Sequence, residues 1–211
     1  MVTPSRSGNL LGITINEDLK WKEHLINGEK GLVKSLTLRV NALKKISTAG
    51  SFKTRLMVAN ACFISVLSYM IIIWGGTEKY LIRTLQVIQN KAARCVTKLT
   101  WFTPTRTLLR QCNWLSVQQL IFYHTAIQMW KIRKYELPVS LHDRFHLRST
   151  RSGSEGALTI PPSDTSLAKK SFSVRAAATW NQIPVTIRNT ESFTNFKRNL
   201  KQWVLVNIPI E

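Results

Sequence analysis

The chain has 211 residues, and 44% of them are hydrophobic, which is normal for a globular protein and excludes a wholly disordered chain. Its charge is unusual, because 30 Lys and Arg residues outnumber 11 Asp and Glu residues and leave a formal net charge of +19. A compact protein with such an excess repels itself and attracts polyanions. The composition therefore favours a nucleic acid as the partner, with an acidic membrane surface as the alternative.

Cysteine usage and the N-terminus indicate the compartment. Cys62, Cys95 and Cys112 are far apart, and no pair has the spacing of a zinc or redox site. Each lies among apolar residues, so we expect small buried side chains in a reducing environment. The first residues lack the apolar run of a signal peptide, and we expect a protein that is intracellular and not secreted.

The first predicted elements are a short strand and a long helix. The apolar run Asn9–Ile15 is typical of a strand, and the Asn-Glu-Asp that follows it suits the start of a helix. From Leu19 to Ile46, apolar residues recur with helical spacing, although two glycines weaken the middle. Ser51 is well placed to cap the next helix.

The stretch Leu56–Trp74 contains no charged residue and is close to the length that spans a bilayer. Lys53 and Arg55 precede it, as a cytoplasmic flank would. Several polar side chains dilute its apolar character, however, and a helix buried on all sides in a large core has the same pattern. We favour the buried helix and keep a single membrane span as the alternative.

The stretch Leu81–Leu99 predicts an amphipathic helix with one basic side. Its apolar face would consist of Leu81, Leu85, Ile88, Ala92, Cys95, Val96 and Leu99. Its polar face includes Gln86 and Asn90 and has no acidic residue. A solvated helix usually mixes both signs of charge, because pairs four residues apart stabilise it. A face of one sign repels itself unless an anion lies against it, so this face is the best candidate for contact with the partner. Its cations are Arg83, Lys91, Arg94 and Lys98.

The rest of the chain predicts a loop at Thr100–Pro104, a short segment to Cys112, and a helix buried on all sides from Ser116 to Tyr135. The composition of residues 143–167 then becomes polar, with one apolar run, Ala157–Ile160, that suits a strand. A short helix follows at 171–180. A final helix begins after Ser192 and has Phe193, Phe196, Leu200, Trp203 and Val204 as its buried stripe.

These elements predict a mainly α fold. We expect the end of one domain, with a short strand, over residues 1–18, a helical bundle over 19–136, and a smaller basic α+β part over 137–211.

Catalytic groups are sparse. The three aspartates, Asp18, Asp143 and Asp164, are scattered, whereas a two-metal phosphoryl-transfer site needs clustered carboxylates. His142 and His146 have the spacing of half a metal site but no third ligand, so we interpret them as surface histidines. No phosphate-cradling glycine loop and no activated nucleophile is present. We therefore expect no catalytic residue, no metal, no cofactor and no small-molecule substrate.

Basic residues are more informative than acidic ones. Besides the four cations of the 81–99 helix, we select basic residues of the polar middle and of the last helix as phosphate contacts. The rings of Trp101 and Phe102 follow the basic helix, where they either stack on a base or close the core; we favour the core. The additional phosphate contacts are Arg148, Arg151, Lys197, Arg198 and Lys201.

The order of several motifs resembles reverse transcriptases of non-LTR (LINE-type) retrotransposons. NLLGITINEDLKWKEHL is similar to the stretch that closes the palm in that family, and YMIIIWGG followed by LQVIQNKAARCVT is similar to a helix pair that comes next. The later pieces TPTRTLL, NWLSV, RSTRS, KSFSVRAAATWNQIP and ESFTNFKRNLK follow in the family's order. Asn16 replaces an aspartate that is frequent in the family, and the cysteine-histidine knuckle of some relatives is absent.

The resemblance implies a fragment of an RNA-directed DNA polymerase. The metal-binding aspartates of the family would lie in an upstream palm and fingers, so this chain would be inactive alone. It would hold the end of the palm, the helical thumb and a C-terminal extension, and it would contact the backbones of an RNA template and a DNA primer. A nuclear location would follow. The alternative is a non-catalytic nucleic-acid-binding protein derived from such an element.

Overall fold

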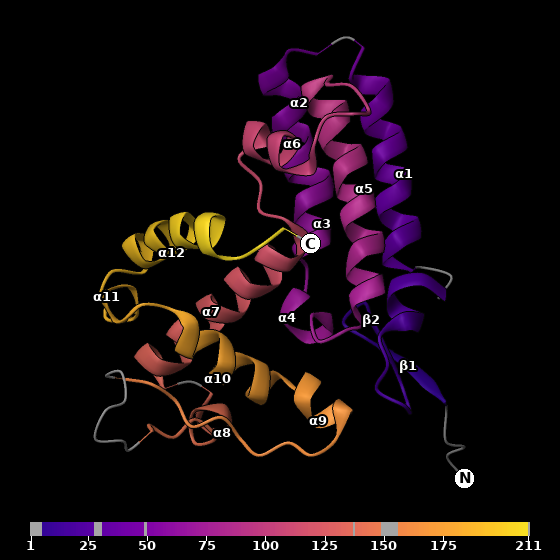
Figure 1. Ribbon diagram of the computed structural model, residues 1–211. Coiled ribbons are helices and arrows are strands. Elements are labelled where there is room, and N and C mark those ends of the chain that lie inside the picture. The colour runs from indigo at the N-terminus through magenta and orange to yellow at the C-terminus, as the bar shows by residue number, and fades with distance from the viewer. Residues whose placement is uncertain (1–5, 28–30, 49, 137, 149–155, 211) are drawn as a thin grey trace. The chain divides into compact units, whose positions relative to one another are not determined.

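The computed structural model describes residues 6–27, 31–48, 50–136, 138–148 and 156–210 (Figure 1). Over these residues the protein is mainly α-helical with a short N-terminal sheet, as the sequence predicts. The chain divides into two compact units: the first runs to Val117 and includes Ile210, and the second runs from Gln118 to Pro209. The boundary predicted from the sequence lies at 136–137, and the assignment of the parts to palm, thumb and extension stays a prediction.

The predicted strand at Asn9–Ile15 is a hairpin. β1 (Ser7–Leu10) pairs antiparallel with β2 (Ile13–Asn16), with Leu10 opposite Ile13. Leu11 and Gly12 form the turn, and both have positive φ, at 51° and 79°. Two central residues with positive φ match the twist of a tight hairpin, and a glycine tolerates that conformation at no steric cost. The apolar run therefore reverses direction at its middle.

The first unit is built on helices that run side by side. The expected helix from Leu19 to Ile46 is divided, because a π-helical turn η1 (Glu23–Asn27) precedes α1 (Leu32–Ile46). α5 (Lys79–Thr97) packs lengthwise on α1 and also contacts α2 (Phe52–Ala59) and α6 (Thr105–Cys112), as Figure 1 shows. The Ser51 hydroxyl accepts a hydrogen bond from the Thr54 amide at 3.2 Å, which confirms the predicted cap.

The prediction of one helix buried on all sides at Leu56–Trp74 is wrong. After α2 the chain forms a π-helical turn and two short helices, with Met70 in the left-handed region at φ 51° between the last two. One stripe is buried, whereas Met57 and Tyr69 are more than half exposed. The lack of charged residues in this segment therefore does not show that all of its side chains are buried. The described helices include none that is long and apolar enough to cross a membrane. The three elements after α2 are η2 (Asn60–Ile64), α3 (Ser65–Ser68) and α4 (Ile71–Trp74).

Arg55, which the sequence analysis considered as a membrane flank, is buried inside the first unit. Its Nε donates to the Val96 carbonyl at 2.8 Å, and its Nη1 donates to the Gly50 carbonyl. A guanidinium that satisfies backbone carbonyls on separate segments holds α2 against the end of α5. A second polar contact joins Trp114 to η2, because Trp114 donates from Nε1 to Asn60 Oδ1 at 2.7 Å.

The second unit has an aromatic core. It contains α7 except for the first residue of that helix, Val117, which belongs to the first unit. Trp130 on α7 packs on Phe196 with ring centroids 5.6 Å apart, and Trp180 lies 6.4 Å from the same ring. Phe122 and Trp203 add a pair at 5.7 Å. Large rings of this kind bury much apolar surface in a small unit. The helices are α7 (Val117–Tyr135), α8 (Val139–His142), α9 (Ser166–Lys170), α10 (Phe172–Gln182), α11 (Val185–Arg188) and α12 (Phe193–Asn207).

The apolar run at Ala157–Ile160 makes less β-structure than expected. Among the described residues it contributes one isolated antiparallel bridge, between Leu147 and Leu158. The Arg148 amide donates to the Ala157 carbonyl at 2.8 Å beside this bridge. Asn181 on α10 then accepts from the Leu158 amide and donates to the Leu158 carbonyl, both at 2.8 Å. The side-chain amide of Asn181 thus forms the hydrogen bonds that a neighbouring strand would form with Leu158.

Candidate nucleic-acid interface

α5 has the amphipathic form that the sequence predicts. It begins after Glu78, whose carboxylate lies at the helix N-terminus, where the helix dipole favours negative charge. Its buried face carries the predicted apolar residues and packs against α1 and α2. Cys95 and Leu99, which were assigned to the same face, are half-buried. The fully buried members of the predicted face are Leu81, Leu85, Ile88, Ala92 and Val96.

The opposite side of α5 is basic and open. Arg83, Lys91 and Lys98 are exposed, and Val87, which lies between the first two, is 50% exposed. Lys98 caps the helix in the left-handed region at φ 60°, and its amide donates to the Arg94 carbonyl at 2.8 Å. This conformation turns the chain out of the helix.

Gln86 and Asn90 do not belong to the open polar side where the sequence analysis placed them. Gln86 is only 6% exposed; its Nε2 donates to Asn90 Oδ1 at 2.9 Å, and its Oε1 accepts from the Val117 amide at 2.9 Å. Asn90 donates to Thr105 Oγ1 on α6 at 2.8 Å. Buried polar groups need such partners, and here they connect α5 to α6 and to the residue that starts α7.

Arg94 holds the loop that follows α5. Its Nη2 donates to the Trp101 carbonyl at 2.9 Å, and its guanidinium carbon lies 4.6 Å from the centroid of the Trp101 ring. The cation therefore covers one face of that ring. We favoured a core position for Trp101 and Phe102, and this was wrong: their exposed fractions are 65% and 92%.

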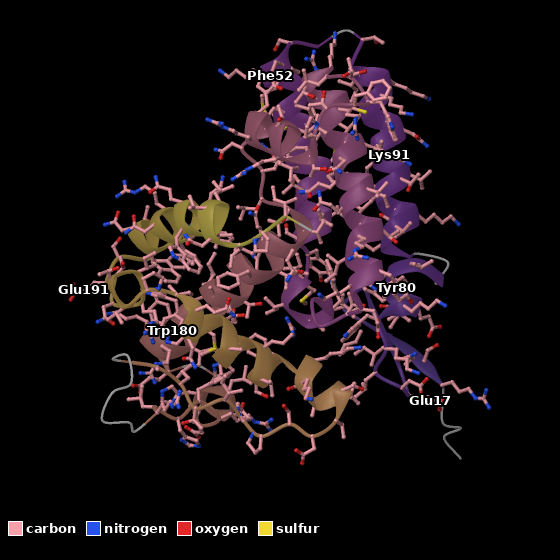
Figure 2. The ribbon with its side chains drawn as sticks, viewed as in Figure 1. Glu17, Phe52, Tyr80, Lys91, Trp180 and Glu191 are labelled. Atoms are coloured by element: carbon pink, nitrogen blue, oxygen red, sulfur yellow. The ribbon has the colours of Figure 1, made fainter. Side chains whose placement is uncertain are left out.

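A groove with a volume of about 450 Å³ lies between α1 and the C-terminal half of α5. Lys91, Arg94 and Lys98 line it from α5 and its cap, with Trp101 at one side. Figure 2 labels Lys91 where α5 runs beside α1. Lys44 lines it from the last turn of α1. No carboxylate is among the described side chains that line this groove, so four cations face one space.

Lys44 is a groove cation that was not predicted from the sequence. The sequence shows Lys44 and Lys45 as ordinary basic residues near a helix C-terminus, where the helix dipole favours them. Nothing in the sequence pattern shows that α1 and α5 pack side by side. Arg83, by contrast, lies on α5 but is absent from the residues that line the groove.

Cys95 lines the same groove but is not set up as a nucleophile. Burial raises the pKa of its thiol, and the positive charge of Lys44 opposes that shift only in part. Burial also raises the pKa of the Cys112 thiol to about 12. Since the thiolate is the reactive form, both side chains stay protonated and inert near neutral pH. All three cysteines are free.

The other predicted contacts lie in the second unit. Lys197 and Arg198 are on α12: the Lys197 ammonium lies 4.7 Å from the centroid of the Phe193 ring, and Arg198 donates to Asn195 Oδ1 at 3.2 Å. Lys201, one turn further along α12, is half-buried, and burial lowers its pKa. Arg148 is exposed beside the β-bridge. Arg151 lies outside the described residues. The described residues contain no group of three potential metal ligands.

The chain is similar in sequence to a known protein. No family model matches the chain, and no solved structure matches it. A Drosophila melanogaster protein described as "Probable RNA-directed DNA polymerase from transposon BS" is 28% identical over 128 residues. The match covers 59% of this chain and 14% of that protein, so the chain spans only a small part of its relative's length. The resemblance to a retrotransposon reverse transcriptase is thereby confirmed.

Proposed function

We propose that this chain is a nucleic-acid-gripping part of a retrotransposon reverse transcriptase, corresponding to its thumb and C-terminal region. The groove between α1 and α5 would hold the phosphates of the template–primer duplex. The relative in Drosophila supports a part in RNA-directed DNA synthesis. The observation that carries the gripping role is the groove itself, which four cations line.

Electrostatics favours a phosphate backbone in this groove. Lys44, Lys91 and Lys98 project positive charge from two elements toward one space with no carboxylate in its described lining. Like charges gathered in this way repel each other in the free protein. A duplex backbone relieves that repulsion and releases its own condensed counterions, which adds a favourable entropy to binding. Such contacts position the duplex and do not depend on base sequence.

The exposed loop beside the groove supplies a second kind of contact. Trp101 keeps 65% of its surface exposed although Arg94 covers one face of its ring, and Phe102 is 92% exposed. Exposed aromatic rings next to a basic groove stack on unpaired bases in many proteins that bind single strands. We therefore place an unpaired template base, next to the end of the duplex, against this loop.

Polymerisation itself would need carboxylates from another part of the polymerase. The three aspartates of this chain are scattered in sequence, and the described residues bring no three potential ligands together. A two-metal mechanism requires clustered carboxylates to hold both ions. We therefore assign this chain the grip on the substrate and assign the chemistry to the palm that the resemblance implies.

A matched pair of triple variants tests the groove. Lys44→Gln, Lys91→Gln and Lys98→Gln together remove three groove cations, whereas Lys34→Gln, Lys45→Gln and Lys53→Gln remove three exposed cations that do not line it. Binding of a fluorescent RNA–DNA template–primer is measured by anisotropy. We expect the groove variant to lose at least about tenfold in affinity and the control variant much less.

Equal losses in the two variants would contradict the proposal, because net charge alone would then explain binding. Circular dichroism of both variants verifies that the helices remain folded. Since all six positions carry exposed side chains, we expect neither variant to lose more than about 0.5 kcal/mol of stability by removal of these charges.

A further inference from the structure

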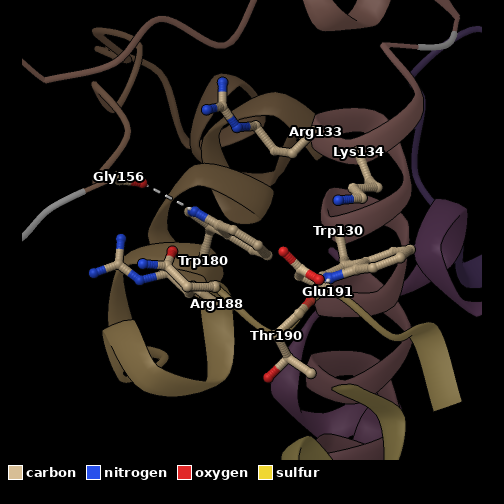
Figure 3. Close-up of a pocket in the computed structure, with 9 residues that line it drawn as sticks. Trp130, Arg133, Lys134, Gly156, Trp180, Arg188, Thr190 and Glu191 are labelled. Atoms are coloured by element: carbon tan, nitrogen blue, oxygen red, sulfur yellow. Dashed lines mark hydrogen bonds between the residues drawn. The ribbon is translucent and has the colours of Figure 1, made fainter. Parts of the chain in front are cut away.

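A second recess lies wholly within the second unit, between the end of α7 and the segment from α10 to residue 191 (Figure 3). Its volume is about 190 Å³, below the roughly 300 Å³ of pockets that enclose drug-sized ligands. The recess therefore suits a small group. The side chains that define it are Trp130, Trp180, Arg133, Lys134, Arg188 and Glu191.

Two fixed tryptophans form the walls. Trp130 donates from Nε1 to the Thr190 carbonyl at 3.1 Å and packs on Phe196, and it is only 4% exposed. Trp180 donates from Nε1 to the Gly156 carbonyl at 3.1 Å, as the dashed line in Figure 3 shows, and it is equally buried. Because both rings are packed and hydrogen-bonded, neither is open for a base to stack on it. Packing and hydrogen bonds therefore hold both walls of the recess in place.

The charges around this recess are mainly positive. Arg133, Lys134 and Arg188 line it together with one carboxylate, that of Glu191, so the lining carries a net excess of two positive charges. Figure 3 shows Lys134 and Glu191 directed toward the space between the two tryptophans. Arg188 is 6% exposed, and a buried guanidinium interacts with an anion in a medium of lower dielectric than water.

We infer that this recess binds a phosphate group, either the terminal phosphate of a nucleic-acid strand or a free phosphate ion. A phosphate fits its volume, matches its charge, and accepts hydrogen bonds from guanidinium and ammonium donors. Asn189 and Thr190 line the recess and add polar atoms. The inference does not depend on the proposed function, because the recess lies in the second unit and shares no residue with the α1–α5 groove.

Thermal unfolding of the full chain tests phosphate binding directly. At equal ionic strength, about 10 mM inorganic phosphate in place of chloride raises the melting temperature by about 3 °C if the dissociation constant is about 1 mM. The double variant Arg133→Gln/Lys134→Gln loses this shift. The control Arg144→Gln/Lys169→Gln removes two exposed cations of the same unit outside the recess and keeps it.

A second arm identifies the source of the phosphate. Anisotropy compares a 5′-phosphorylated single strand with the same strand ending in a 5′-hydroxyl. At least about fivefold tighter binding of the phosphorylated strand, lost in the recess variant, assigns a strand terminus; a melting shift without that preference assigns free phosphate.

Absence of both effects, or equal loss in the recess and control variants, would overturn the inference. The groove triple variant separates it from the proposed function. We expect that variant to keep the phosphate-dependent shift in melting temperature, because none of its three substitutions lies in the recess. This expectation holds whether or not the variant still binds a template–primer.

Discussion

At the scale of single residues, the two roles of Arg94 show why a basic residue is not always a free contact. The sequence groups it with three other cations, yet its guanidinium donates to the Trp101 carbonyl and covers the Trp101 ring. A lysine could not reproduce both interactions, because it lacks the planar fork that stacks and donates together. We therefore assign Arg94 to holding the loop as well as to the charge of the groove.

Burial of His24 makes the stability of the first unit depend on pH. It is 8% exposed, its Nδ1 lies 3.4 Å from the Thr14 amide that donates to it, and burial lowers its pKa. The unfolded chain then binds more protons than the folded one below about pH 6.5, so stability falls as pH decreases from about 6.5 toward the folded-state pKa. The neutral imidazole is the form that the fold favours.

We predict that the free energy of unfolding decreases less in His24→Gln than in the unchanged protein between about pH 7 and pH 5. Glutamine keeps an acceptor for the Thr14 amide but does not titrate. Urea unfolding at several pH values measures the difference. Burial also lowers the pKa of His124, so the variant retains part of the pH dependence. Identical profiles for the two proteins would show that His24 does not contribute.

At the scale of elements, α5 ends at a charged residue that has an unfavourable backbone conformation. Lys98 occupies the C-cap at φ 60°, a region in which glycine is the favoured residue. Asn113 caps α6 in the same region at φ 54° but carries no charge. Lys98 also lines the basic groove. A lysine therefore occupies a position at which glycine would be the more stable residue.

Lys98→Gly is expected to raise the free energy of unfolding by about 0.5–1 kcal/mol, because glycine adopts positive φ without steric cost. The same variant should bind a template–primer more weakly, since a groove cation is lost. Asn113→Gly is the matched control: we expect a smaller gain, because asparagine tolerates the region better, and unchanged binding. Denaturation and anisotropy measure both properties. If the Lys98→Gly protein binds the template–primer with unchanged affinity, Lys98 is not part of the interface.

The segment from Phe52 to Trp74 shows the limit of prediction for elements. Its cap at Ser51 was predictable, because a serine before a helical pattern has a local role. Its division was not, since neither the left-handed Met70 nor the π-helical turn at Asn60–Ile64 has a signal in the sequence. Both adjust the chain so that Phe63, Leu67 and Trp74 reach the core. Tertiary packing decided that geometry.

At the scale of the whole molecule, the net charge of +19 dominates association with any polyanion. If the four groove cations contact phosphates, the logarithm of the binding constant should fall with the logarithm of salt concentration with a slope of about −3 to −4. Anisotropy titrations between about 50 and 200 mM salt measure this slope, and the groove triple variant should reduce its magnitude by about 2–3. A salt-independent affinity would exclude a surface that follows the phosphate backbone.

The sequence by itself determined the properties that depend on local patterns. These are the mainly helical class, the amphipathic α5 with its basic side, and the cap at Ser51, because helical spacing and capping act within a few residues. The order of its motifs also indicates a reverse transcriptase, and the similarity to the Drosophila protein agrees with it.

Only the tertiary structure decided which of these residues share a space. It brought Lys44 of α1 to the cations of α5, turned Gln86 and Asn90 inward as hydrogen-bonding groups, and left Trp101 and Phe102 exposed. It also gathered Trp130, Trp180 and Arg188 around one recess. These outcomes depend on packing between segments far apart in the chain, and a pattern along one segment contains no information about its neighbour in space.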